Sequence, residues 1–260
     1  DYMDMDAIKR HFGAGEAAVM SVLAGADLVL LGPDLETQRE VHAALLAAMR
    51  DGTLSEERVR EAAGRSLAVA QAYPPQLDAE APPYAAHREL ARQVAEAGAT
   101  LLWNDDVLPL AAAADVLVIA PQPGGFGEPP HLGDVLARSL PGVRSLAVAT
   151  NPTEEQIATA LAQAQTADVV VLATYHWLGA FPAGMARLAD SLGATGTPLV
   201  VVAIGNPDDV RFLSVRPAAF LAVYGYREAN LQGAAAVLTG AITARGVLPV
   251  PIEGVPAAPR

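Results

Sequence analysis

Short apolar runs alternate with segments of helical periodicity from residue 84 onward, and this alternation restricts the fold more than any other feature of the sequence. The apolar runs predict strands over residues 100–103, 115–120, 145–149, 169–174, 199–204 and 220–224. The periodic segments predict helices over residues 85–97, 133–139, 153–165, 182–192 and 228–238. Repeated strand–helix units of this kind form a mostly parallel sheet with helices on both faces. The sequence therefore predicts an α/β sandwich in this part of the chain.

Residues 1–73 show a shorter series of the same kind. A helix is expected over residues 15–23, and the apolar run at residues 27–31 is typical of a parallel strand buried on both faces. Two more helices are expected, one over residues 34–51 and one beginning at Ser55. This pattern again indicates strand–helix units.

A Pro-rich stretch separates the two series. Residues 74–83 read P-P-Q-L-D-A-E-A-P-P, a sequence that cannot continue a helix and favours an extended connection. We therefore expect two domains, residues 1–73 and residues 84–260, with residues 74–83 as the linker between them.

Composition excludes several classes of function. The formal net charge of -12 and the isoelectric point near 4.7 argue against a nucleic-acid partner, which needs clustered Lys and Arg. No apolar run reaches the roughly 18 to 20 residues that a membrane span needs. The absence of Cys removes disulfides, thiolate nucleophiles and Cys-based metal sites, but it does not indicate a compartment. The chain begins on an acidic segment without an initiator Met or a targeting signal, and we expect its natural N-terminus to lie upstream.

The first eight residues, D-Y-M-D-M-D-A-I, resemble the nucleophile segment of glycoside hydrolase family 3, in its β-N-acetylglucosaminidase branch. The resemblance continues through G-E-A-A at residues 15–18 and A-G-A-D-L at residues 24–28. The second half resembles the C-terminal αβα sandwich domain of the same family, on T-L-L-W-N-D at residues 100–105 and G-N-P at residues 205–207. The resemblance implies that residues 1–73 are the last strand–helix units of a (β/α)₈ TIM barrel and that the sandwich domain follows them.

The same resemblance implies the chemistry. A retaining glycosidase needs a carboxylate that attacks the anomeric carbon and a proton donor to the leaving oxygen. Asp1 takes the place of the family's nucleophile, although the Thr or Ser that normally precedes it is absent. The proton donor, a His on an earlier barrel loop in this branch, does not occur in these residues. The implied activity is the removal of terminal β-linked GlcNAc from cell-wall or chitin-type saccharides, and a barrel segment outside these residues would be its partner.

Other residues could contact the substrate, but each has a structural interpretation too. Met3 follows the nucleophile segment. His131 and the pair His176 and Trp177 follow predicted strands, where they could face a crevice or simply cover the sheet edge. No metal or organic cofactor is implied, because protein groups and water are sufficient for the reaction.

Two alternatives stay open. Family 3 β-glucosidases usually carry S-D-W at the nucleophile, whereas this chain has D-Y-M at residues 1–3, so the β-N-acetylglucosaminidase branch fits the residues better. In the second alternative, the chain is a non-catalytic α/β module that binds a partner or stabilises a barrel supplied elsewhere. In either case we expect the 260 residues by themselves to be inactive.

Overall fold

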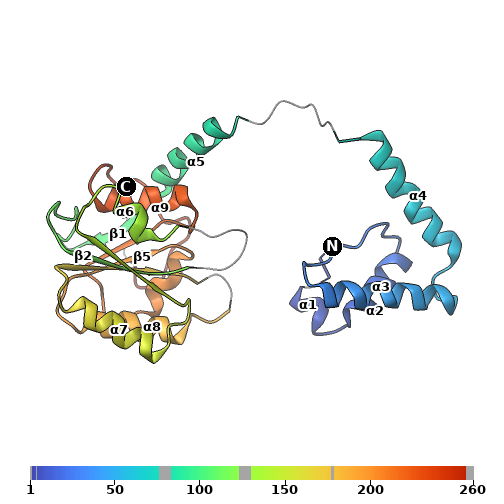
Figure 1. The fold of residues 1–260 in the computed structure, drawn as a ribbon, viewed down its shortest axis with the longest axis horizontal. Coiled ribbons are helices and arrows are strands. Elements are labelled where there is room, and N and C mark those ends of the chain that lie inside the picture. The colour runs from blue at the N-terminus through green and yellow to red at the C-terminus, as the bar shows by residue number, and fades with distance from the viewer. Residues whose placement is uncertain (1, 4, 76–82, 123–129, 177–178, 256–260) are drawn as a thin grey trace. The chain divides into compact units, whose positions relative to one another are not determined.

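The computed structural model describes residues 2–3, 5–75, 83–122, 130–176 and 179–255. The chain separates into two compact units, Asp1–Glu80 and Ala81–Arg260 (Figure 1). Each unit has its own apolar clusters, and the two are described in turn.

The second unit is built on one six-stranded sheet. Its strands are β1 (Thr100–Asn104), β2 (Val116–Pro121), β3 (Val143–Val148), β4 (Val169–Thr174), β5 (Leu199–Ala203) and β6 (Ala219–Ala222). They lie in the order β1-β6-β5-β4-β2-β3, with β1 antiparallel to β6 and all other neighbours parallel. Every strand lies within two residues of the bounds expected from the sequence. The predicted mostly parallel sheet is therefore confirmed.

Helices cover both faces of this sheet. They are α5 (Tyr84–Gly98), α6 (Leu132–Leu136), α7 (Glu154–Ala164), α8 (Ala183–Gly193) and α9 (Glu228–Leu238), with a 3₁₀ helix η1 (Pro207–Phe212) after β5. Helices α6 and α9 lie on one face, where α5 packs on α9, and α7 and α8 lie on the other (Figure 1). The second unit is thus the predicted αβα sandwich.

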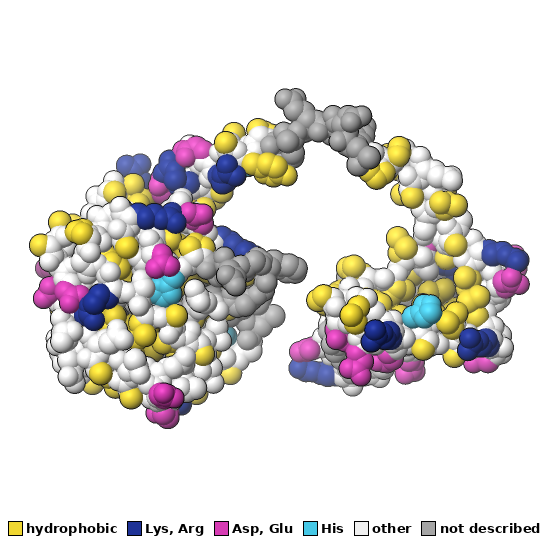
Figure 2. Space-filling view, in the orientation of Figure 1, with side chains coloured by type: hydrophobic (Ala, Val, Ile, Leu, Met, Phe, Trp, Pro, Cys, Tyr) yellow, Lys and Arg dark blue, Asp and Glu magenta, His cyan; other side chains and the backbone are white. Residues whose placement is uncertain are grey.

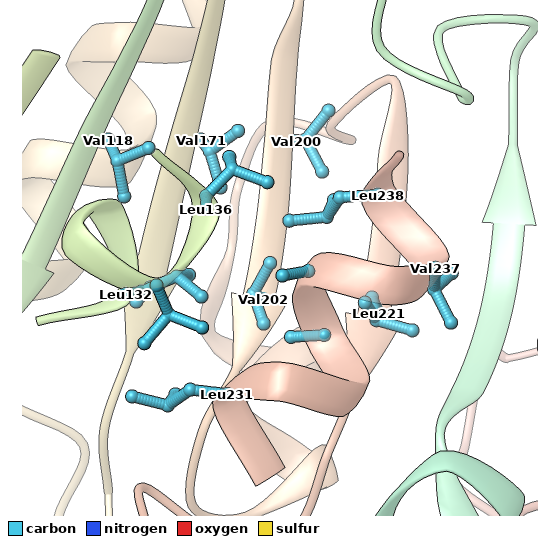
Figure 3. Packing of buried hydrophobic residues seen from close by; sticks show 14 of the residues in the cluster. Val118, Leu132, Leu136, Val171, Val200, Val202, Leu221, Leu231, Val237 and Leu238 are labelled. Carbon is cyan, nitrogen blue, oxygen red and sulfur yellow. The ribbon is translucent and has the colours of Figure 1, made fainter. Parts of the chain in front are cut away.

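Alternate side chains of each strand enter opposite cores. Figure 3 shows the first core, in which Val118, Val171 and Val202 of the sheet pack against Leu136 of α6 and Leu231 of α9. The neighbouring strand residues point the other way: Leu117, Ile119, Leu172 and Val201 pack against Met185, Leu188 and Leu192 of α8. Parallel strands buried on both faces are uninterrupted apolar runs for this reason.

Helix α7 begins with the capping box expected from T-x-x-Q at residues 153–156. The Thr153 hydroxyl accepts a hydrogen bond from the Gln156 backbone N–H at 3.3 Å, and the Gln156 side chain accepts one from the Thr153 N–H at 3.1 Å. Two backbone donors at the start of the helix are satisfied in this way.

The first unit consists of α1 (Asp6–Lys9), α2 (Ala14–Leu23), α3 (Leu35–Arg50) and α4 (Glu56–Ala72) among its described residues. Helices α2 and α3 pack on each other through Ala18 and Val41, which are buried. A second small cluster joins Val22, Ala48 and Leu54. The helices expected in this unit are confirmed.

The strand expected at residues 27–31 is not formed in the described part of the chain. One parallel bridge, between Tyr2 and Leu30, takes its place, and the side chains of Leu28 and Leu30 are 77% and 60% exposed. A parallel strand obtains both its hydrogen bonds and its burial from neighbouring strands and covering helices. Tyr2 is the bridge partner that the described residues provide for this segment, and only its other side chains, Val29 and Leu31, pack on α2 and α3, so the prediction of a strand covered on both faces is wrong here.

Large apolar side chains lie on the surface of the first unit. Five of them, Met20, Leu23, Leu28, Leu30 and Leu35, are between 48% and 77% exposed. Figure 2 shows hydrophobic side chains on the face of this unit that is in view. Side chains of this size and type are more often buried than exposed in a folded domain. No helix of the described residues is long and apolar enough to cross a membrane.

Candidate functional site

In the sheet of the second unit, successive strands are added first on one side of β2 and then on the other, so the strand order reverses between β2 and β4. The chain passes from β2 to β3 on one side, and then returns to β4 on the other side of β2 before it continues to β5 and β6. Ligands of open α/β sheets bind outside the carboxyl ends of the strands at such a switch point. His131 lies on the segment that leads from β2 into α6, and His176 follows β4. The sequence-predicted candidates therefore lie on the two segments that leave this edge of the sheet.

His131 is a structural residue of this edge. It is buried, with 4% of its surface exposed, and its Nδ1 accepts a hydrogen bond from the Gly133 N–H at 3.0 Å at the start of α6. Its Nε2 lies 3.2 Å from the carbonyl oxygen of Leu146. Because a carbonyl oxygen only accepts, Nε2 carries the proton, and both ring nitrogens are engaged.

His176 lies in a small aromatic enclosure. The ring meets the edges of Phe181 and Phe212, with a centroid distance of 5.9 Å to each, and these two phenyl rings stack on each other at 5.0 Å. Its Nε2 is 2.9 Å from the carbonyl oxygen of Gly179, and 9% of the residue is exposed. Its Nδ1 faces the Oδ1 atom of Asp209 at 3.5 Å.

Asp209 is the residue of this edge that the sequence did not single out. It lies on η1, immediately after the turn G-N-P at residues 205–207, and it is fully buried. Its Oδ2 accepts a hydrogen bond from the Thr174 hydroxyl at 2.7 Å. Burial raises the pKa of its carboxyl group to about 6, and the Thr174 hydrogen bond opposes this effect in part. The sequence shows two adjacent acidic residues, Asp208 and Asp209, after a predicted strand, but it does not indicate that the Asp209 carboxylate is buried.

Two tyrosines pack together on the opposite face of the same edge. The rings of Tyr175 and Tyr226 meet at right angles with a centroid distance of 5.3 Å, and the Arg227 guanidinium lies over Tyr226 at 5.1 Å. Burial and the neighbouring Tyr226 raise the pKa of Tyr175. These rings contact one another, and Trp177, a candidate either for substrate contact or for covering the sheet edge, lies outside the described residues.

In the first unit, Met3 is the described residue that was expected to contact the substrate. Its N–H donates to the Leu30 carbonyl oxygen at 3.0 Å, and its sulfur lies 3.8 Å from the Ser21 hydroxyl. Its side chain is buried, with 6% of the residue exposed. Asp1 itself lies outside the described residues, so its role as nucleophile stays a prediction.

The chemistry that the described residues offer is that of carboxylates, imidazoles and hydroxyls. Among them no group of three or more His, Asp or Glu side chains is arranged to hold a metal ion. Asp209 is the described carboxyl group whose pKa is raised toward neutrality. The second unit thus has an αβα fold and a carboxyl edge lined by histidines, tyrosines and one buried acid.

Comparison with known proteins identifies the family. Residues 99–257 match the C-terminal domain of glycosyl hydrolase family 3, so the chain belongs to this family. No curated protein matches the chain. The family resemblance and the αβα sandwich predicted from the sequence are both confirmed.

Solved structures of glycoside hydrolases are similar to most of the chain or to all of it. A family 3 β-N-acetylglucosaminidase from Paenibacillus sp. str. FPU-7 is 31% identical, with a TM-score of 0.75 over 97% of this chain and 50% of its own. A fungal multi-domain family 3 β-N-acetylglucosaminidase is 21% identical, with a TM-score of 0.72 over 100% of this chain and 31% of its own, which shows the fold alone. A β-glucosidase from Listeria innocua is 26% identical, with a TM-score of 0.57 over 88% of this chain and 36% of its own. The chain therefore spans half the length of the Paenibacillus protein and about a third of the length of the other two.

Proposed function

We propose that the chain is part of a retaining exo-β-N-acetylglucosaminidase, which removes terminal β-linked GlcNAc from cell-wall or chitin-type saccharides. Family 3 membership supports glycoside hydrolysis as the class of reaction. The observation that carries the finer proposal is the 31% identity to the Paenibacillus β-N-acetylglucosaminidase over 97% of this chain, which includes the first unit as well as the sandwich.

In this proposal Asp1 is the nucleophile. Its carboxylate attacks the anomeric carbon, the bond from that carbon to the leaving oxygen breaks, and a proton donor outside the 260 residues protonates the leaving oxygen. Water then attacks the glycosyl ester and gives its proton to the same donor group, which restores both side chains. The sugar carbon keeps its configuration because it is inverted twice.

Residues 1–73 would be the last strand–helix units of a TIM barrel, in which catalytic groups lie at the carboxyl ends of strands. Two features of the first unit support this role. Tyr2 and Leu30 form a parallel bridge, as neighbouring barrel strands do, and the exposed side chains of Leu28 and Leu30 provide an apolar surface that further barrel residues would cover. Residues 74–83 would link this part to the sandwich.

A β-glucosidase is the second candidate, favoured by the 26% identity to the Listeria innocua enzyme. A protein that contains these 260 residues together with its complete barrel should be assayed on an aryl β-N-acetylglucosaminide and on the matching aryl β-glucoside. We expect a kcat/KM at least tenfold higher on the first substrate. A preference for the glucoside would select the second candidate, and no hydrolysis of either would support a non-catalytic module.

A further inference from the structure

Thr174, His176 and Asp209 form a buried polar cluster that the proposed hydrolysis does not use. They come from two neighbouring strand ends, because Thr174 is the last residue of β4 and Asp209 lies on η1 after β5. The side chain of Asp209 is 0% exposed and that of His176 is 10% exposed. A buried charge or polar atom is costly unless it is paired, so the hydrogen bonds of this cluster can be counted atom by atom.

Two of the four polar atoms of the His–Asp pair are committed to other partners. The Gly179 carbonyl oxygen only accepts, so the Nε2 atom of His176, 2.9 Å away, must donate its proton there. The Oδ2 atom of Asp209 accepts from the Thr174 hydroxyl at 2.7 Å. The first of these contacts fixes the tautomer of the neutral His176 ring, with the proton on Nε2.

The other two atoms face each other at 3.5 Å. They are Nδ1 of His176 and Oδ1 of Asp209, both buried, and within the described residues neither has another hydrogen-bond partner. With Nε2 protonated, a neutral imidazole presents a lone pair at Nδ1, and an ionised carboxylate presents lone pairs at Oδ1. Two acceptors would then face each other in a pocket walled by Phe181 and Phe212.

We propose that His176 Nδ1 and Asp209 Oδ1 share one proton, and that this proton holds His176, two residues after β4, against η1. The proton can reside on either atom, because a carboxylic acid donates to a neutral imidazole and an imidazolium donates to a carboxylate. Loss of the proton converts an attractive contact into a repulsive one. His176 is therefore held against η1 at low pH and released from it as the pH rises.

No cation on the neighbouring elements is free to replace the shared proton among the described residues, because the nearby charged side chains have other partners. On η1, Asp208 lies next to Asp209 and pairs with Arg211 at 3.5 Å. On α8, Arg187 pairs with Glu154, and Asp190 accepts from the Ser214 N–H. Strands β4 and β5 carry no charged residue.

The direction of the pH dependence follows from the carboxyl group. Burial raises the pKa of Asp209 from an ordinary value of 3.8 to about 6. The folded chain therefore binds this proton more tightly than the unfolded chain does, so the stabilisation is complete below the ordinary value and is lost as the pH rises through about 6.

The test compares the 260-residue chain with its Asp209→Asn variant in urea unfolding between pH 4 and pH 8. Asn keeps the shape of a protonated carboxyl group: its amide donates to His176 Nδ1 at every pH, and its oxygen still accepts from Thr174. Relative to this variant, the unfolding equilibrium constant of the unmodified chain should rise by roughly fiftyfold across that range. The matched control is Asp208→Asn, the same change one residue away, which should retain the pH dependence of the unmodified chain.

A second measurement needs no variant. The side-chain ¹³C carboxyl resonance of Asp209 should titrate with a midpoint near 6. Above that pH, amide hydrogen exchange at Gly179 and Phe181 should accelerate. An unfolding difference between the unmodified chain and Asp209→Asn that is flat from pH 4 to pH 8, or a carboxyl titration at the ordinary value of an Asp, would overturn the proposal.

Discussion

Arg58 and Asp27 form an ion pair, 2.9 Å between Nη2 and Oδ1, that fastens α4 to the segment following α2. The same guanidinium donates from Nε to the Val22 carbonyl oxygen at 3.0 Å and from Nη2 to the Ala26 carbonyl oxygen at 2.9 Å. Carbonyl groups at the end of a helix have no partner within the helix, so a side chain from another helix can satisfy them. Arg58 is 15% exposed and joins three parts of the first unit.

Arg58→Ala should destabilise the first unit by about 2 kcal/mol, because the backbone carbonyls of Val22, in the last turn of α2, and Ala26, beyond its end, lose a charged donor. Urea unfolding of the 260-residue chain measures this loss. Arg60→Ala is the matched control on the same helix: Arg60 is 74% exposed and contacts Glu56. It should change the stability by less than about 0.5 kcal/mol. Equal effects of the two substitutions would contradict this role of Arg58.

The contribution of Asp27 should depend on pH. The hydrogen bond from Arg58 holds the pKa of the Asp27 carboxyl group below its ordinary value. A lowered pKa means that the stabilisation is present above the ordinary value and is lost as the pH falls below about 4. The difference in stability between the unmodified chain and Arg58→Ala should therefore shrink in acid. A difference that grows as the pH falls would show that the pair is not ionised in the folded chain.

Thr153→Ala should cost about 1 kcal/mol, because it removes the hydroxyl that accepts from the Gln156 N–H at the start of α7. The same substitution at Thr159 is the control. The Thr159 hydroxyl donates back to the Glu155 carbonyl oxygen in the middle of α7, where Ala is the better helix former. Thermal unfolding should therefore show a lower midpoint for Thr153→Ala and an unchanged or higher one for Thr159→Ala.

Gly205→Ala should weaken the carboxyl edge of the sheet. A Cβ at this position would lie 2.7 Å from the His176 carbonyl oxygen and 3.1 Å from the Tyr175 ring, so the ends of β4 and β5 must move apart. We expect a loss of about 1 to 3 kcal/mol. Gly64 on α4 has open space at the corresponding position, and Gly64→Ala should stabilise its helix by about 0.5 to 1 kcal/mol. A neutral Gly205→Ala substitution would contradict the close approach at this edge.

The sandwich could be predicted from the sequence because the residue types of each strand indicate how deeply that strand is buried. Runs such as V-V-V-L-A-T at residues 169–174 are apolar on both sides of the strand, as burial under two helical layers requires. The start of α7 could be predicted equally well, since the two residues of its capping box, Thr153 and Gln156, are three positions apart in the sequence.

Features that depend on distant neighbours could not be predicted in this way. The run at residues 27–31 has the composition of a buried strand, but the described residues provide one bridge partner, Tyr2, and leave Leu28 exposed. The burial of Asp209 depends on the approach of Thr174 and His176, which lie more than thirty residues earlier in the chain. Sequence periodicity reports the local environment of a residue and not the partner that the fold brings to it.

The most direct test of the proposed function is covalent trapping on the complete enzyme. A fluorinated N-acetylglucosaminide that reacts slowly in the second step should leave a glycosyl ester on the peptide that contains Asp1, and peptide mass spectrometry locates it. Asp1→Asn should abolish the ester and lower kcat on an aryl β-N-acetylglucosaminide by at least roughly a thousandfold. Asp6→Asn, the same change at a side chain that is 84% exposed, should retain both the ester and the rate. An ester on a different residue, or an unchanged rate in Asp1→Asn, would contradict the account.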